Sequence, residues 1–253
     1  MSYADTEARH SKISRFIDVT LSATAIFVLA PMFALVSLCI LIETGRPIIY
    51  RQTRFGLDGR KFQILKFRKF RKTTSDRGSP LTLIDDERMT RIGGILARSK
   101  LDELPQLVNI LRGDMAFVGP RPESLDFADC FNQTTICVLK HRPGLFGPSQ
   151  IAFRNECALY PKDSDPADYY RRVLFPAKFK LDQEYYPNRT VSSDIRLLFD
   201  GALAVLGVNA DPTGAIRLCQ AASPALTSAN AAHEILGGLQ LRSKPAQLEG
   251  RQG

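Results

Sequence analysis

The sequence predicts an α+β fold, mostly helical with a short β-hairpin, in a monotopic membrane protein with an N-terminal re-entrant helix. Residues 19–42 carry no charge. Two short alternating segments then flank an Asp-Gly step, and the apolar residues of 101–112 recur at helical spacing. At 253 residues and 44% hydrophobic content, the chain is long enough for one sizeable core.

The uncharged segment favours a helix that enters the membrane and returns. A straight helix over residues 19–42 would reach ~36 Å, but Pro31 at its midpoint divides it into two arms of ~18 Å. Arginine and lysine lie on both flanks, which places both ends on the cytoplasmic side. On the residues alone, a Pro-kinked spanning helix is an equal alternative. We therefore divide the chain into an N-terminal tail (1–15), a re-entrant membrane helix broken at Pro31 (16–42), a folded domain (43–208) and a mobile tail (209–253).

The folded domain begins with a predicted hairpin. Segments 48–54 and 60–67 read as strands around Asp58-Gly59, a strong hairpin signal. A basic stretch and a helix over 87–98 follow. Residues 123–139 then read as mostly helical, and 141–148 as an irregular loop. A last helix over 192–208, capped by Ser193 or Asp194, either packs in the core or lies at the membrane interface, and we favour the interface.

Residues 101–122 combine two carboxylates with an arginine. Leu104, Leu107, Val108 and Leu111 predict one buried helical face that ends at Gly113, with Pro105 in the first turn. Asp102 stands where an N-cap belongs, and a cap is its plainest interpretation. A second acid, Glu103, and Arg121, held between two prolines, instead indicate phosphate chemistry.

Composition narrows the function classes. The net charge of +8 favours anionic partners, namely nucleic acid, phosphorylated substrates or acidic lipid. The uncharged segment and the lack of a nucleic-acid-binding motif argue against nucleic acid. The five cysteines never form CxxC, and the three histidines lie in no GxSxG or HExxH pattern, so neither a zinc site nor a hydrolase triad is indicated.

Over about residues 16–208 the chain resembles the bacterial sugar transferase family, the small monotopic phosphoglycosyl transferases. The resemblance lies in an ordered series of motifs: RFIDV (15–19), YRQTRFGLDGRKF (50–62), KFR (66–68), LDELPQL (101–107), GDM (113–115), VGPRP (118–122) and RPGLFG (142–147). It implies transfer of a sugar-1-phosphate from a UDP-sugar to polyprenyl (undecaprenyl) phosphate with release of UMP. Such a reaction would begin exopolysaccharide, capsule, O-antigen or glycoconjugate assembly at the cytoplasmic face of the bacterial inner membrane.

The resemblance also gives expected roles to single residues. Asp102 would attack the β-phosphorus and form a phosphosugar-aspartyl intermediate, and Glu103 would help to bind Mg²⁺. Arg121 would hold the diphosphate. The other expected substrate-binding residues are Lys66, Arg68, Arg98, Arg142 and Arg154.

Several positions depart from the family pattern. Ala97 stands where the family has arginine, so Arg98 would have to serve instead, and Ala30 precedes Pro31 where many members have serine. Phe146 replaces a threonine, and Lys69-Phe70 replace Thr-Met after KFR. A non-catalytic membrane-bound scaffold is the alternative function, which the intact carboxylate pair disfavours. The sugar and the pathway are not readable from the sequence, and a homo-oligomer is an open alternative to a monomer.

Overall fold

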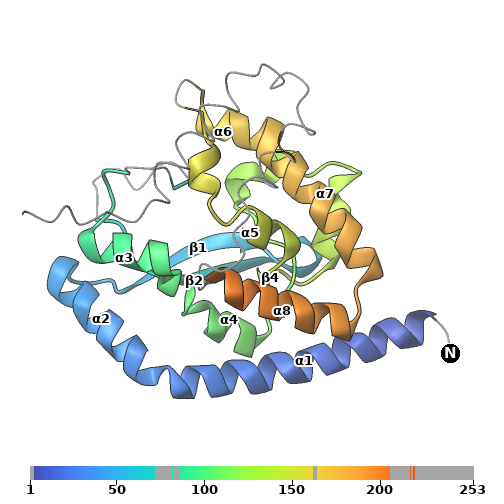
Figure 1. The fold of residues 1–253 in the computed structure, drawn as a ribbon, viewed down its shortest axis with the longest axis horizontal. Helices are drawn as coiled ribbons and strands as arrows, with labels where there is room; N and C mark the ends of the chain where they lie inside the picture. Colours follow the sequence, from blue (N-terminus) through green and yellow to red (C-terminus); the bar gives the residue numbers. More distant parts are fainter. Residues whose placement is uncertain are drawn as a thin grey trace, which may run out of the picture.

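The computed structural model describes residues 3–71, 81–82, 86–161 and 164–205, together with Arg217 and Cys219 (Figure 1). Helices surround a small amount of sheet, so the α+β class with a short hairpin is confirmed. The predicted tail 209–253 lies outside the described residues except for Arg217 and Cys219.

A bent helical arm runs along one side of the molecule (Figure 1). It consists of α1 (Tyr3–Val28) and α2 (Ala30–Thr44), which meet at an angle of 61°. Pro31 explains the break, because it has no N–H to donate to the carbonyl of Phe27 one turn earlier. Since α1 is one continuous helix from Tyr3, the boundary expected after residue 15 is not the end of a structural element.

The predicted hairpin is confirmed. Strands β1 (Ile49–Phe55) and β2 (Lys61–Phe67) pair antiparallel, from Ile49 opposite Phe67 to Phe55 opposite Lys61. In the connecting turn, Asp58 and Gly59 have φ values of 55° and 73°, the left-handed conformation that an Asp-Gly step accepts at low cost.

Two helices and a short turn follow the hairpin. Helix α3 (Arg91–Ser99) begins later than the predicted 87–98, because Thr90 caps it by accepting a hydrogen bond from the N–H of Gly93. Helix α4 (Gln106–Arg112) ends at Gly113 as predicted, with φ of 94°. The buried face of α4 includes Leu107 and Ile110, whereas Leu111 is exposed, so the predicted face is rotated.

A second, two-stranded sheet was not predicted. Strand β3 (Ala116–Val118) pairs in parallel with β4 (Gly144–Phe146), which lies inside the expected irregular loop. Gly119 permits the pairing, because a Cβ there would stand 2.1 Å from the carbonyl oxygen of Arg142. The expected helix over 123–139 consists instead of 3₁₀ segments, Leu125–Cys130 and Thr135–Lys140.

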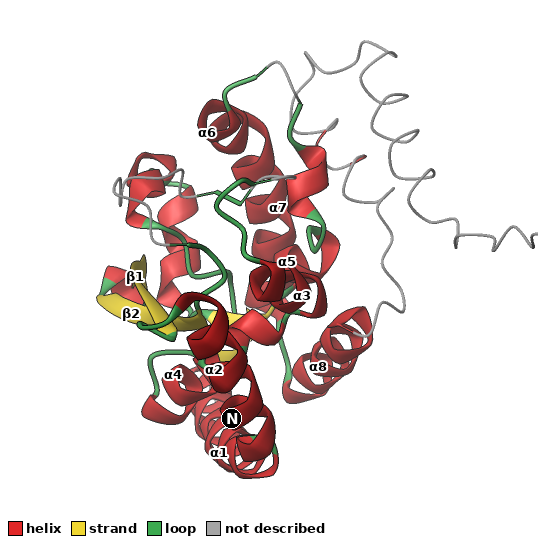
Figure 2. Ribbon diagram, turned by 90° about the vertical axis from the view of Figure 1, so that its left-hand side faces the viewer, coloured by secondary structure: helices red, strands yellow, loops and turns green. Residues whose placement is uncertain are grey.

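The remaining helices are α5 (Pro148–Ala152), α6 (Pro166–Tyr169), a π-helical turn (Tyr170–Leu174), α7 (Phe175–Tyr185) and α8 (Val191–Val205), with 3₁₀ turns at Glu156–Leu159 and Tyr186–Asn188. Helices α5 and α8 contact the second sheet, whereas α6 lies away from both sheets (Figures 1 and 2). Thr190, rather than Ser193 or Asp194, accepts the capping hydrogen bond of α8, from the N–H of Ser193 at 3.1 Å. Leu198 of α8 packs toward the core, whereas Ile195 and Phe199 are exposed.

The bent arm is part of the core. Ala25, Ile26, Leu29 and Phe33, on either side of the break, pack against a cluster that includes Ile64 of β2 and Ile110 of α4. Val36 and Ile40 of α2 pack with Phe67 and Leu96. The hinge of the arm is therefore held by the same residues that support β2 and α4.

The glycine pair of α3 gives a matched test of its packing. A Cβ on Gly93 would stand 2.0 Å from the carbonyl oxygen of Lys69, whereas a Cβ on Gly94 would meet nothing closer than 3.9 Å. We expect Gly93→Ala to lower the free energy of unfolding by about 3 kcal/mol or more, because backbone must move. Gly94→Ala is expected to raise it by about 0.5–1 kcal/mol. Thermal unfolding in detergent, followed by circular dichroism, measures both, and equal effects would contradict this packing.

Candidate active site

Asp102 and Glu103 lie in a separate 3₁₀ turn, Leu101–Glu103, between α3 and α4. Lys100, with a left-handed φ of 60°, ends α3 and redirects the chain into this turn. Helix α4 starts only at Gln106, with Pro105 in the cap position and no side-chain cap hydrogen bond. The prediction that Asp102 caps this helix is therefore wrong, and its carboxylate is left for other contacts.

Two lysines, one at the end of β2 and one just after it, face the two carboxylates. The Nζ of Lys66 lies 2.8 Å from Oε1 of Glu103, and the Nζ of Lys69 lies 3.8 Å from Oδ2 of Asp102. Both lysines are largely buried, with 20% of each side chain exposed. Ion pairs with this little solvent are screened much less than surface pairs. The two acids and two lysines form a compact, nearly neutral group.

Burial and charge act differently on the two acids. Asp102 is only 3% exposed, and burial raises its pKa against the opposing charge of Lys66. Burial also acts to raise the pKa of Glu103, but the charges of Lys66 and Lys100 outweigh it and hold that pKa at about 2. Oδ1 of Asp102 is buried and has no hydrogen-bond partner among the described residues. Glu103 is thus a stable anion, and Asp102 is a carboxylate with little solvation.

Asn109 fixes the lysines opposite the acids. It is 1% exposed, and its Oδ1 accepts a hydrogen bond from the N–H of Leu65 at 3.0 Å. Its Nδ2 donates to the carbonyl oxygen of Gln63 at 2.8 Å. These bonds tie β2 to α4, and so set the register between Lys66 and the acid turn. Sequence reasoning missed Asn109, although a polar residue among the apolar positions of this helix was a readable signal.

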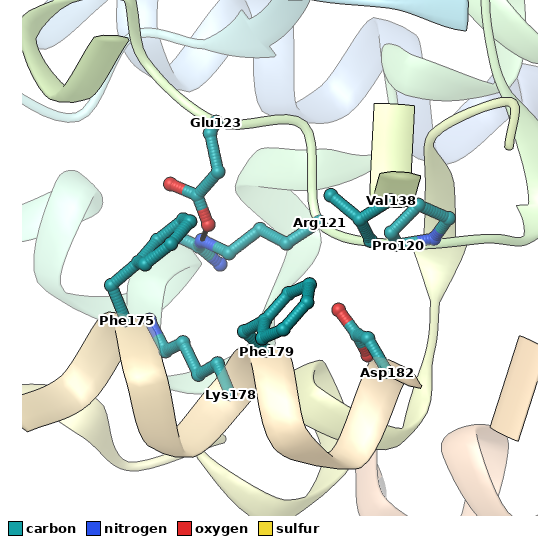
Figure 3. A pocket seen from close by; sticks show the side chains of 8 residues that line it. All are labelled: Pro120, Arg121, Glu123, Val138, Phe175, Lys178, Phe179 and Asp182. Carbon is teal, nitrogen blue, oxygen red and sulfur yellow. Dashed lines mark ion pairs between the residues drawn. The ribbon is translucent and has the colours of Figure 1, made fainter. Parts of the chain in front are cut away.

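Arg121 lies beside a second group of buried charges (Figure 3). Its Nε is 4.0 Å from Oε1 of Glu123, whose other oxygen accepts a hydrogen bond from the hydroxyl of Tyr170 at 2.7 Å. Glu156 pairs with Lys178 at 2.6 Å. Burial acts to lower the pKa of Arg121, but the charges of Glu156 and Glu123 raise it, with a smaller contribution from Glu103. Arg121 thus stays cationic and links the acid turn to this group.

A pocket of about 270 Å³, counting its open mouth, borders Arg121 (Figure 3). Its lining combines an apolar wall with buried charged groups: Pro120, Val138, Phe175, Phe179, Arg121, Glu123, Lys178 and Asp182. Burial raises the pKa of Asp182 to about 7, although the Ser149 hydroxyl donates to its Oδ2 at 3.1 Å. Sequence reasoning missed Glu123, Glu156, Lys178 and Asp182, because they lie in no motif and meet only in the fold.

Arg68 lies at the end of the helical arm and not with the acid pair. It is 7% exposed, and its guanidinium donates to the carbonyl oxygens of Thr44 at 2.9 Å and Gly45 at 2.8 Å. These carbonyls end α2, where backbone acceptors have no partner within the helix. Arg68 therefore anchors α2 in this structure, and its expected contact with substrate stays a prediction.

The other predicted arginines are dispersed. Arg98 is exposed in the last turn of α3. Arg142 lies near enough to Asp18 for its charge to act against the burial that raises the pKa of that carboxyl, and the Nε of Arg142 is buried without a partner among the described residues. Arg154 donates to the carbonyl oxygen of Val205 at 3.0 Å and is close enough to Glu103 to respond to its charge. The structure thus gathers Lys66 and Arg121 near the acids, with Arg154 next in order.

Comparison with known proteins gives a consistent set of relatives. Residues 9–208 match the protein family described as bacterial sugar transferase. The chain is 31% identical over 191 residues to UDP-glucose:undecaprenyl-phosphate glucose-1-phosphate transferase of Escherichia coli (strain K12), covering 74% of this chain and 39% of that protein. It is 33% identical over 207 residues to the exopolysaccharide production protein ExoY of Sinorhizobium fredii (strain NBRC 101917 / NGR234), covering 76% and 84%.

A third relative is an enzyme for another sugar. The chain is 29% identical over 199 residues to UDP-N-acetylgalactosamine-undecaprenyl-phosphate N-acetylgalactosaminephosphotransferase of Aeromonas hydrophila, covering 77% of this chain and 44% of that protein. The chain therefore spans less than half the length of the Escherichia coli and Aeromonas relatives, and most of the length of ExoY.

The position of Arg68 predicts a loss of stability rather than of substrate affinity. We expect Arg68→Met to lower the free energy of unfolding by about 2–4 kcal/mol, because buried carbonyls lose a charged donor. Arg71→Met, at an exposed neighbour, is the control and should be neutral. The chain has no tryptophan, so far-UV circular dichroism in detergent is the measurement. If Arg68→Met is as stable as the wild-type chain but binds UDP-sugar more weakly, this prediction is contradicted and Arg68 is a substrate-binding residue.

Proposed function

The chain belongs to the bacterial sugar transferase family, and from this premise we propose that it transfers a sugar-1-phosphate from a UDP-sugar to polyprenyl phosphate and releases UMP. The observation that carries the proposal is the buried acid turn of Asp102 and Glu103, which pairs with Lys69 and Lys66 and lies close enough to Arg121 for its charge to act on Glu103. Its relatives include transferases that use undecaprenyl phosphate and proteins of exopolysaccharide production, which supports a role in starting such a glycan.

Asp102 is the proposed nucleophile. Its carboxylate attacks the β-phosphorus of the UDP-sugar, an oxygen–phosphorus bond forms, and the bond from that phosphorus to the oxygen shared with the α-phosphate breaks. The electron pair leaves with UMP, and the sugar phosphate stays on Asp102. Burial to 3% exposure supports this role, because a poorly solvated carboxylate loses little hydration when it attacks.

Glu103 and Arg121 hold the diphosphate in this proposal. Mg²⁺ takes one or two carboxylates together with phosphate oxygens, and Glu103, with a pKa of about 2, is ionised at neutral pH. In the described part of the chain, no group of three or more His, Cys, Asp or Glu side chains lies close enough together to hold a metal ion. When bound, Mg²⁺ would neutralise the diphosphate charge. Arg121 adds a planar cation suited to phosphate.

The second half-reaction brings in the lipid. A phosphate oxygen of polyprenyl phosphate attacks the same phosphorus, the bond to Asp102 breaks, and the carboxylate leaves as an anion. The product is a polyprenyl diphosphate sugar. The reacting phosphate of the lipid must therefore reach Asp102 from the membrane surface.

The bent arm of α1 and α2 supports insertion into one leaflet. No single helix among the described residues is long and apolar enough to cross a bilayer, whereas the bent pair together meets both criteria. Phe27 is 83% and Ile42 77% exposed, which suits a lipid contact. On either side of the uncharged segment 19–42, Arg15 of α1 binds α4 and Glu43 of α2 binds the first turn of α3. Because both sides of this segment contact one domain, entry and return on the same side fit better than a span.

This topology is testable by labelling from either side of the membrane. In a chain whose native cysteines are replaced by serine, Lys12→Cys and Arg51→Cys should both react with an impermeant maleimide only from the cytoplasmic side. The reason is that Lys12 precedes and Arg51 follows the uncharged segment 19–42, and both positions stay with the domain. Intact and inverted vesicles give the two measurements, and labelling of the two positions from opposite sides would show a spanning helix.

The nucleotide product tests the chemistry. With Mg²⁺, polyprenyl phosphate and a panel of UDP-sugars, we expect release of UMP, because the phosphorus–oxygen bond is broken. Asp102→Asn should lower UMP release by at least about 10³-fold, as expected for a lost nucleophile. Asp168→Asn, at a half-exposed acid of α6, is the control and should keep full activity. Release of UDP would instead show ordinary glycosyl transfer.

A further inference from the structure

Lys69 directly follows the KFR motif (66–68) and lies beside the acid turn. Its ammonium lies 3.8 Å from the carboxylate of Asp102, the residue proposed above as nucleophile.

The backbone of Lys69 is held firmly by α3. The N–H of Thr90 donates to the carbonyl oxygen of Lys69 at 3.0 Å. Gly93 lies against the same carbonyl, so close that only a residue without a Cβ fits. The next residue, Phe70, forms a β-bridge with Met89. The start of the Lys69 side chain is therefore fixed with respect to the acid turn that follows α3.

The side chain is held from the other direction by an aromatic ring. The ammonium lies 5.2 Å from the ring centroid of Phe70, and the guanidinium of Arg88 lies 4.6 Å from the same centroid. Only 20% of the Lys69 side chain is exposed. Burying an ammonium is costly unless an anion faces it, and Asp102 supplies that anion.

The spacing between Lys69 and Asp102 leaves the donors of the ammonium available. A distance of 3.8 Å is an ion pair but is too long for a hydrogen bond. Among the described residues, Nζ of Lys69 donates no hydrogen bond, whereas Nζ of Lys66 donates to Glu103 at 2.8 Å. An ammonium has three N–H donors, so Lys69 can take a second anion beside Asp102.

We propose that Lys69 is a catalytic residue that binds a non-bridging oxygen of the β-phosphate while Asp102 attacks the phosphorus. A phosphorus bonded to Asp102 carries its oxygens within reach of a cation held this close to the carboxylate. Lys69 therefore stabilises the charge that gathers on the phosphoryl oxygens in the transition state. In the second half-reaction it stabilises the departing carboxylate. The inference rests on the proposed function, since it requires Asp102 to be the nucleophile.

The test compares charge and size at position 69 in a single turnover. Purified full chain in detergent, with Mg²⁺ and the UDP-sugar that gives turnover but no lipid, should release a burst of UMP. Lys69→Met should lower the burst rate constant at saturating UDP-sugar by about 10²-fold. The half-saturation concentration should change by less than about threefold, because the contact forms in the transition state. Lys69→Arg keeps the charge, so its burst rate constant should be at least about tenfold higher than that of Lys69→Met.

Controls separate the outcomes. Lys61→Met removes an exposed lysine at the start of β2 and should leave the burst unchanged. Lys69→Thr, a smaller neutral variant, serves if Lys69→Met is unstable by circular dichroism, and the same slow burst is expected of it. If the wild-type chain gives a burst of UMP, two results overturn the inference. One is an unchanged burst rate constant in folded Lys69→Met or Lys69→Thr, and the other is a rate constant as low in Lys69→Arg as in Lys69→Met. A wild-type chain that releases no UMP without lipid overturns the covalent mechanism and this inference together.

Discussion

Two neighbouring carboxylates share one turn with little solvent around it, and like charges this close repel unless cations face them. The ion pairs of Lys66 with Glu103 and of Lys69 with Asp102 meet that requirement. Lys66 lies at the end of β2 and Lys69 two residues beyond it, so the position of Lys66 opposite the turn depends on a fixed register between β2 and α4. Asn109 provides this register through hydrogen bonds to the backbone of β2. The chemistry of the site therefore depends on a buried amide that touches neither acid.

Side-chain hydrogen bonds to backbone groups also hold the helical arm to the domain. Side chains of one part satisfy the backbone groups at helix ends in the other. Arg15 donates to carbonyls that end α4, Glu43 accepts from the first N–H groups of α3, and Arg68 donates to the carbonyls that end α2. These bonds fix the height and tilt of the arm relative to the acid turn. The reaction proposed above joins a membrane lipid to a water-soluble nucleotide, so it requires the carboxylates at a set distance from the membrane surface, and bonds of this kind would fix that distance.

Sequence reasoning succeeded where short-range physics decides the structure. The β-hairpin follows from alternation and Asp58-Gly59, the end of α4 from Gly113, and the break in the arm from Pro31. It failed where distant residues decide. Whether Asp102 caps a helix depended on how α3 ends at Lys100, and the partners of Arg68 lie more than twenty residues earlier in the chain. Two further features join segments that carry no motif, so no local pattern predicts them. They are the parallel pairing of β3 with β4 and the buried ion pair of Glu156 with Lys178.

The central claim is that Asp102 carries the sugar phosphate between the two substrates. Lys100 and Arg112 flank the acid turn, so trypsin releases residues 101–112 as one peptide. The direct measurement is a rapidly quenched reaction with UDP-sugar labelled in its β-phosphate, without lipid, followed by digestion and mass spectrometry. The account predicts one hexose-phosphate on this peptide, attached at Asp102, that disappears when polyprenyl phosphate is added. If no adduct forms on the peptide before lipid is added, and the label appears only on the lipid afterwards, this claim is contradicted.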